Sequence, residues 1–318
     1  MIHVRVVSPV DLSPRVGEVL VGNPAVLNVT TFEGVVHQPP GDVIEFDVLH
    51  GAADGVLGSL RGLDLDTRGS IALDNPDVVI SASAKIAEEG QPRFEQFAPV
   101  WEEVESRIRS DGTYPPSWFM LLVIAGLIGS VGILTNSQIL IVAAMVVGPE
   151  YGAIMSLAFG ITTRDGSRVL SSIGALFFGF GLAVIASLLL GVMIRAGGLA
   201  PEAFLVGIRP VSNLINTPNW FSFIVAVLAG VVGVVSLTEA RTSTLIGVFI
   251  SVTTIPAAAD IGVSIAFQSW HEAWGSALQL LLNVTVLVLV AVIGLPLQRG
   301  LWRRVLRPHP APSATSAS

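Results

Sequence analysis

Six apolar stretches follow Pro116, and they restrict this chain more than any other feature of its sequence. They lie at about 117–134, 138–160, 169–194, 220–238, 244–267 and 275–297. Each is long enough to cross a bilayer as a helix, which takes about 20 predominantly apolar residues. The sequence therefore predicts an α-helical integral membrane protein with six transmembrane helices, because helices satisfy their backbone polar groups internally in lipid.

The residues before the first stretch differ in charge. Of the 24 acidic residues, 18 lie in residues 1–117 beside eight Lys or Arg, whereas residues 118–318 hold six acidic residues and nine Arg. An acidic soluble part argues against a nucleic-acid partner, whose phosphates demand a basic face. The chain has no cysteine, which excludes disulfides and thiol chemistry.

Residues 1–93 predict a small α+β cytoplasmic domain. Strand-like runs lie at 2–8, 25–37 and 42–49, with a last strand at 70–73 and 78–80, and helix-like runs lie at 13–21 and 52–63. This βαββαβ order is that of the ferredoxin-like split motif, a fold that hosts many functions and so does not decide one. His3, His37 and His50 lack the spacing of metal ligands, so we expect no metal site.

Residues 94–116 predict an amphipathic linker helix. Phe94, Phe97, Trp101, Val104 and Ile108 recur at steps of three and four, with charged residues on the other faces. We expect this apolar stripe to pack on the soluble domain or on a neighbouring subunit, which makes a homo-oligomer one expected state. The transmembrane domain then occupies residues 117–298, and a basic, then disordered, tail occupies residues 299–318.

The arginines predict the orientation of the chain. Nine of them lie on the side that would hold both termini, and only Arg195 and Arg209 lie on the other side. By the positive-inside rule, both termini are cytoplasmic. No signal peptide is recognisable at the N-terminus. We therefore expect a multi-pass protein of the cytoplasmic membrane, with the bilayer as its first partner.

The second stretch contains Gly148-Pro149-Glu150 near its middle. Pro149 removes a backbone donor and disfavours a helical conformation at Gly148. Glu150 would lie about 18 Å from the start of the stretch, a depth where a carboxylate is costly and normally faces protein or water. Two interpretations stand: a functional site in which Glu150 is a candidate proton carrier, or a structural kink with a snorkelling side chain.

The six stretches resemble two copies of three. AGLIGSV from Ala125 matches AGVVGVV from Ala229 at an offset of 104, and Pro149 then corresponds to Pro256 at an offset of 107. An odd number of spans per copy predicts a 3+3 inverted repeat, in which interrupted helices meet near the midplane. The segment after Pro256 carries Asp260, which is either buried or interfacial.

Other polar residues at membrane depth are candidates for hydrogen bonds between helices or for a pathway: Asn136, Ser137, Thr253, Thr254 and Asn283. The sequence contains no catalytic triad pattern, zinc-protease motif, phosphate-binding loop or dinucleotide motif. We therefore expect no enzymatic activity, no catalytic residues and no cofactor.

Three segments resemble a known family: VWEEVESRIRSD, GILTNSQILIVAAMVVGPEYG and RTSTLIGVFISVTTIPAAADIG. They are similar to the bacterial and archaeal membrane proteins grouped as domain of unknown function 389, and the resemblance covers about Val100 to Leu297. Its most specific part is the pattern from Asn136 to Pro149. The residues Glu150-Tyr151-Gly152 depart from the usual Gly-Pro and indicate a subgroup. The resemblance implies the membrane fold and assigns no role to any residue.

Two functions follow from these features. The first is a secondary transporter or channel for a small solute or ion, with its site between the second and fifth spans around Pro149, Glu150, Pro256 and Asp260. The second is a membrane-anchored sensor or scaffold whose soluble domain binds a small molecule or partner. The interrupted spans favour the first, and the large acidic domain favours the second.

Overall fold

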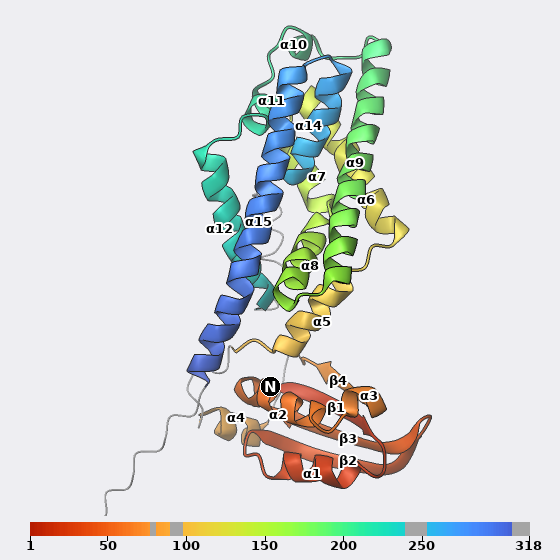
Figure 1. Cartoon of the computed structure of the whole chain (residues 1–318), viewed down its shortest axis with the longest axis vertical. Coiled ribbons are helices and arrows are strands. Elements are labelled where there is room, and N and C mark those ends of the chain that lie inside the picture. Colours follow the sequence, from red (N-terminus) through yellow and green to blue (C-terminus); the bar gives the residue numbers. More distant parts are fainter. Residues whose placement is uncertain (77–80, 90–97, 239–252, 307–318) are drawn as a thin grey trace, which may run out of the picture. The chain divides into compact units, whose positions relative to one another are not determined.

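The computed structural model describes residues 1–76, 81–89, 98–238 and 253–306 (Figure 1). The chain divides into two compact units, Met1–Val104 with Arg299–Ser318, and Glu105–Gln298. We call them the sheet unit and the helical unit. The division falls inside the predicted linker, within helix α5 (Trp101–Asp111).

In the described part of the sheet unit, four antiparallel strands form a sheet in the order β2-β3-β1-β4. The strands are β1 (Ile2–Ser8), β2 (Val26–His37), β3 (Pro40–Val48) and β4 (Ser70–Asp74). The helices are α1 (Ser13–Val21), α2 (His50–Arg61), α3 (Leu65–Arg68) and α4 (Ala82–Glu89). The predicted βαββαβ order is observed, with α3 added before β4. The predicted strand segment at 78–80 lies outside the described residues.

Alternation along β1 explains the core of this unit. Val4 and Val6 are fully buried and pair with Phe46 and Ile44 of β3, because every second side chain of a strand points to the same face. The apolar faces of α1 and α2 pack in the same cluster, which includes Leu20 and Leu60 among others. A sheet with helices on one face follows from this pattern.

The described residues of the helical unit include four helices that are long and apolar enough to cross a membrane. They are α6 (Pro116–Leu134), α9 (Gly166–Ala196), α12 (Trp220–Thr238) and α15 (Trp270–Val305). A fifth candidate span is the pair α7 (Gln138–Val147) and α8 (Glu150–Thr163), bent by 49°. These five match predicted spans.

The remaining apolar helix is α14 (Thr254–Ala266), which is shorter than a span. It forms the second half of the predicted span at 244–267, and the first half of that span lies outside the described residues. Two short helices, α10 (Glu202–Leu205) and α11 (Pro210–Ile215), lie between α9 and α12 and were not predicted.

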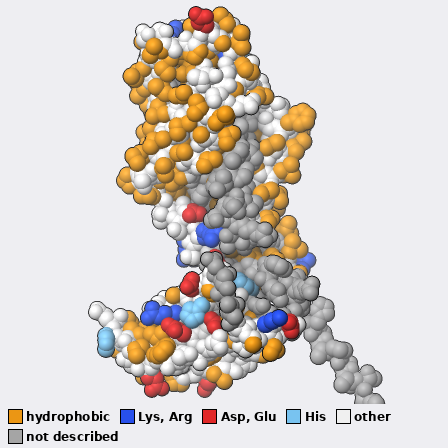
Figure 2. All heavy atoms as spheres, turned by 180° about the vertical axis from the view of Figure 1, so that it is seen from behind, with side chains coloured by type: hydrophobic (Ala, Val, Ile, Leu, Met, Phe, Trp, Pro, Cys, Tyr) orange, Lys and Arg blue, Asp and Glu red, His pale blue; other side chains and the backbone are white. Residues whose placement is uncertain are grey.

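The surface of the helical unit is apolar where the long helices face outward. Phe177, Leu189, Phe221 and Ile293 are each more than half exposed. Figure 2 shows hydrophobic side chains spread over this unit on the face drawn there, while charged side chains gather mainly on the sheet unit. An apolar surface of this extent is unfavourable in water and suits a lipid environment. The chain is therefore a membrane protein.

Candidate functional site

The break between α7 and α8 is the centre of the candidate site. The helix α7 ends at Val147, Gly148 is extended with ψ of 128°, and Pro149 precedes the first residue of α8. The indole Nε1–H of Trp118 donates a 3.2 Å hydrogen bond to the carbonyl oxygen of Pro149. This side-chain donor stabilises a backbone carbonyl at a place where the helix is interrupted.

Glu150 is buried at this break and is bound by a residue from the fifth stretch. Its side chain is 6% exposed, so it does not snorkel to the surface. Thr254 Oγ1, at the start of α14, donates a 2.5 Å hydrogen bond to Glu150 Oε1. Glu150 Oε2 accepts no hydrogen bond from the described residues. One carboxyl oxygen is thus held by protein, and the other is buried without a donor from the described residues.

Gly148 is required by the position of this carboxyl group. A Cβ atom at residue 148 would overlap Glu150 Oε2 and would lie 2.7 Å from Cγ1 of Ile255. Real Cβ atoms do not approach so closely, so any larger residue would displace Glu150 or Ile255. The Gly-Pro pair therefore serves two purposes, since Pro149 interrupts the helix and Gly148 leaves room for the acid.

A chain of hydrogen bonds from two side-chain amides extends to Thr253, the residue before Thr254. Gln279 Nε2 donates to Asn283 Oδ1 at 3.1 Å, and Asn283 Nδ2 donates to Thr253 Oγ1 at 3.2 Å. Gln279 and Asn283 are 3% and 2% exposed, although they lie in the apolar helix α15. Gln279 Oε1 has no partner among the described residues. The predicted residues Glu150, Thr253, Thr254 and Asn283 are thus brought together.

Asp260 lies in a second polar cluster and is completely buried. Ser212 Oγ of α11 donates to Asp260 Oδ1 at 2.7 Å, and Ser276 Oγ of α15 donates to Asp260 Oδ2 at 2.6 Å. Asn216 Nδ2 donates in turn to Ser212 Oγ at 3.4 Å. Both carboxyl oxygens are therefore satisfied by hydroxyl groups from two other helices, and the side chain is enclosed by protein.

Arg209, which precedes α11 and Ser212, has its own acidic partner. Arg209 Nη1 donates to Glu272 Oε2 at 2.6 Å and to Ser269 Oγ at 2.7 Å. Its guanidinium also lies 4.1 Å from the centre of the Phe204 ring. Asp260 is consequently held by neutral donors rather than by a salt bridge.

Sequence reasoning missed the polar stripe on α15. Ser276, Gln279 and Asn283 follow one another at steps of three and four, so they share one face of the helix. This stripe links the Asp260 cluster to the break at Glu150, because Ser276 contacts Asp260 and Asn283 contacts Thr253. A helical spacing of polar residues in an apolar span was the signal that could have revealed it.

Asn136 and Ser137 lie apart from both clusters, in the turn from α6 to α7. Asn136 has a left-handed conformation with φ of 53°, and the N–H of Ser137 bonds to the carbonyl of Gly132 at 2.8 Å. This is the Schellman arrangement that closes a helix, and Asn tolerates its backbone angles. Ser137 then caps α7 by accepting from the N–H of Leu140 at 3.5 Å.

The two prolines of the predicted site, Pro149 and Pro256, occupy different positions relative to their helices. Pro149 precedes α8, whereas Pro256 is the third residue of α14. Pro256 therefore lies in a first turn, where a missing N–H removes no hydrogen bond within the helix. The residues that occupy equivalent positions at the helix starts are Glu150 and Thr254, which are 104 residues apart.

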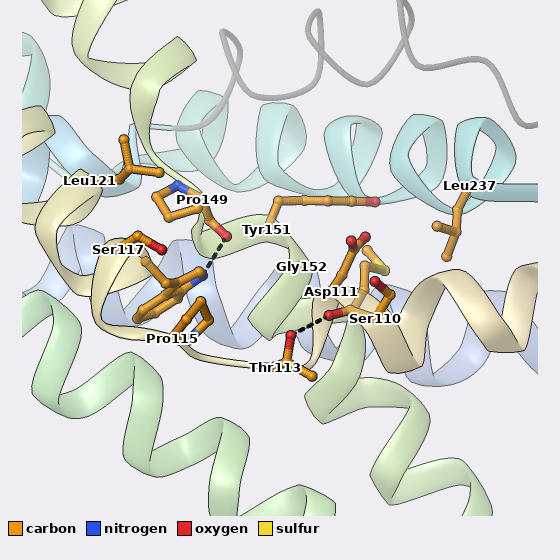
Figure 3. Close-up of a pocket in the computed structure, with 12 residues that line it drawn as sticks. Ser110, Asp111, Thr113, Pro115, Ser117, Leu121, Pro149, Tyr151, Gly152 and Leu237 are labelled. Atoms are coloured by element: carbon orange, nitrogen blue, oxygen red, sulfur yellow. Dashed lines mark hydrogen bonds between the residues drawn. The ribbon is translucent and has the colours of Figure 1, made fainter.

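A cavity of about 380 Å³ adjoins the break (Figure 3). Pro149 and Tyr151, the neighbours of Glu150, line it together with Trp118 and Asp111. Burial raises the pKa of Asp111, and the nearby charge of Arg107 acts in the opposite direction. Its remaining lining residues are Ser110, Thr113, Pro115, Ser117, Leu121, Gly152, Met155 and Leu237.

The residues of the described ranges do not form a metal site. No group of three or more His, Asp or Glu side chains lies close enough together there to bind a metal ion. A buried carboxyl group with hydroxyl neighbours, such as Glu150, can exchange a proton or form hydrogen bonds to a solute.

Comparison with known proteins agrees with the resemblance in the sequence. Residues 145–289 match the model of a domain of unknown function, DUF389. Over 174 residues the chain is 24% identical to the uncharacterized protein MJ0678 of Methanocaldococcus jannaschii, covering 55% of this chain and 52% of that protein. The chain thus spans about half the length of this curated relative. No solved structure matches the chain. The match to this domain model therefore lies within the region of about Val100 to Leu297 whose sequence resembles the same family.

Proposed function

We propose that this protein is a secondary transporter or channel whose site lies between the second and fifth spans, at Glu150 and Thr254. The hydrogen bond between these two residues carries the proposal. It joins two interrupted apolar segments through a buried acid, and intramembrane acids of this kind mark solute, ion or proton pathways. Glu150 is the proton carrier, because its Oε2 has no hydrogen-bond donor among the described residues.

The proposal includes six spans arranged as a 3+3 inverted repeat. Support comes from a constant offset of 104 residues: α8 starts at Glu150 and α14 at Thr254, and each helix is followed by a left-handed residue, Arg164 or Gln268. The same offset relates the sequences that begin at Ala125 and Ala229. Repeats of three spans necessarily have opposite orientations.

The proposed site is reached through the cavity beside Pro149 and Tyr151. We place this cavity on the cytoplasmic side, together with both termini of a multi-pass protein of the cytoplasmic membrane, because nine of eleven arginines outside residues 1–93 lie on that side in the six-span arrangement. The polar stripe of α15 and Asp260 would then continue the pathway beyond Glu150. The solute itself is a small molecule or ion.

Flux into proteoliposomes that hold the full-length protein tests this function. With a panel of small solutes and ions and an imposed pH gradient, we expect pH-dependent flux that is lost in Glu150→Gln, which keeps size and hydrogen bonding but no titratable proton. The matched control is Glu202→Gln, which neutralises an exposed acid of α10.

Two results would contradict the proposal in different ways. An unchanged pH profile in a normally accumulating Glu150→Gln protein would remove Glu150 as the proton carrier. An absence of flux for every solute tested would favour the other function, a membrane-anchored sensor or scaffold whose sheet unit, with its ferredoxin-like element order, binds a small molecule or partner.

A further inference from the structure

The sheet unit holds a pair of carboxyl groups that the proposed pathway does not use. Asp54 belongs to α2, and Glu102 belongs to the first turn of α5. Asp54 Oδ1 accepts a 2.9 Å hydrogen bond from the backbone N–H of Trp101, and the side chains of Asp54 and Glu102 lie within hydrogen-bonding reach of each other. The pair therefore joins two helices that are far apart in the sequence.

The hydrogen bonding of this pair requires a proton. Ionised carboxylates only accept hydrogen bonds, so two carboxyl groups can bond to each other only when one of them is protonated. Glu102 Oε1 accepts from Arg61 Nη1 at 3.2 Å, whereas the buried Glu102 Oε2 accepts from no donor among the described residues. A proton on Asp54 would supply the missing donor.

The titratable and charged groups around the pair come from α2 and α15. Arg61 of α2 holds Glu102, and the positive charge of Arg299 in α15 acts on Asp54. The guanidinium of Arg299 also lies 5.5 Å from the centre of the Trp101 ring. His50 lies one turn before Asp54 on α2. The pair is thus the point in the sheet unit where α2, the start of α5 and the end of α15 interact.

Burial determines the pH range in which Asp54 loses its proton. Burial, followed by the hydrogen bond that protonated Asp54 donates to Glu102, raises the pKa of Asp54 to about 7, although the N–H of Trp101 and the charge of Arg299 act in the opposite direction. Burial, together with the charge of the chain N-terminus, lowers the pKa of His50 to about 4, so His50 stays neutral near pH 7. Loss of the proton would leave two adjacent anions, which repel each other.

We propose that Asp54 and Glu102 bind one shared proton, and that this proton fastens the start of α5 to α2 and releases it as the pH rises. The helix α5 leads directly into α6, the first apolar span, and α15 is itself a span. The shared proton is therefore a cytoplasmic pH signal that is transmitted to the spans. This last step rests on the proposed transport function, whereas the fastening of α5 does not.

Spin-label distances in the full-length protein test the fastening directly. The chain has no cysteine, so Ser59→Cys on α2 and Ser106→Cys on α5 introduce a unique pair of labelling sites. We expect a narrow distance distribution at about pH 5.5 and a broad one at about pH 8.5, on either side of the Asp54 pKa. Asp54→Asn should keep the distribution narrow at both pH values, because its amide both accepts from Trp101 and donates to Glu102.

Two further variants make the test decisive. Asp54→Ala should give the broad distribution at both pH values, and the matched control Glu105→Gln, on the same helix, should behave like the original protein. A pH response that survives in Asp54→Asn, or a distribution that does not respond to pH in the original protein, would overturn the proposal. Failure of transport in every protein, with the expected distances, would instead contradict the proposed function alone.

Discussion

Thr254 Oγ1 donates a hydrogen bond of 2.5 Å to Glu150 Oε1, and each of these residues is the first residue of its helix. Both side chains are buried, so the bond replaces water around a carboxyl group whose transfer out of water is otherwise costly. The starts of α8 and α14 are therefore joined through a side-chain contact that depends on one hydroxyl group.

Removing that hydroxyl should destabilise the helical unit. Thr254→Val keeps the shape of the side chain and leaves Glu150 Oε1 without its donor, which should lower the free energy of unfolding by about 1–3 kcal/mol. Thr254→Ser is the matched control because it retains the hydroxyl. Unfolding of both variants in detergent measures the difference, and equal stabilities would show that the hydrogen bond contributes nothing.

Substitution of Gly148 should be harmful for a steric reason. Gly148→Ala places a methyl group against Glu150 and Ile255, and overpacking of this kind costs about 1–3 kcal/mol. At Gly174 of α9 a Cβ would contact nothing, so Gly174→Ala should be neutral or stabilising by up to about 1 kcal/mol. Melting temperatures of the two variants provide the comparison. A stable Gly148→Ala protein with an undisturbed Glu150 would contradict the packing described above.

The helical unit should fold when Asp260 is replaced by Asn, but it should be destabilised when the polar atoms of this side chain are removed. Asp260→Asn can still bond to Ser212 and Ser276, since hydroxyl groups rotate to donate or accept. Asp260→Ala leaves both buried hydroxyls without an acceptor, at a cost of about 1–3 kcal/mol for each. The amount of folded protein recovered from membranes should therefore fall for Asp260→Ala and not for Asp260→Asn. The reverse order would exclude this role for the hydroxyl groups.

The stability of the sheet unit should depend on pH through two opposing groups. The pKa of Asp54 is raised from 3.8 to about 7, so its contribution is complete below pH 3.8 and is lost as the pH rises toward 7. The pKa of His50 is lowered from 6.5 to about 4, so its contribution is complete above pH 6.5 and is lost as the pH falls toward 4.

In Asp54→Asn, the pH dependence of the free energy of unfolding should therefore come from His50 alone. Its free energy of unfolding should rise from about pH 4 to about pH 6.5, whereas that of His50→Gln should fall from about pH 4 to about pH 7. Asp42 has a lowered pKa and acts only below this range. Hydrogen exchange of β1 amides in the full chain, corrected for intrinsic rates, measures both slopes. Parallel slopes in the two variants would contradict the assignment.

The orientation of the chain can be read from single cysteines. Gly112→Cys and Ser313→Cys should be labelled only from the cytoplasmic side, and Ala200→Cys only from the external side, if six spans place both termini inside. The cysteine-free chain is its own control for background labelling. Termini on opposite sides of the membrane would exclude both the six-span arrangement and the inverted repeat.

Composition and periodicity were sufficient for the class of the protein and for most of its elements. Apolar stretches of about 20 residues predict α6, α9, α12 and α15 because lipid leaves a helical backbone almost no alternative. The alternation in Ile2–Ser8 predicts β1 within a residue, and the Gly-Pro pair at 148–149 predicts the break between α7 and α8. Each of these signals is local, so no knowledge of distant contacts is needed.

Only the tertiary structure decided which polar residues meet. Asn136 and Glu150 both stood out in the sequence, yet Asn136 closes a helix turn and Glu150 bonds to a residue 104 positions away. Likewise, the role of Ser276 is evident only from its hydrogen bond to Asp260. Hydrogen bonds act over about 3 Å and depend on direction, so partners far apart in the sequence are determined by the packing of whole helices. That packing is a property of the folded chain, which no local pattern encodes.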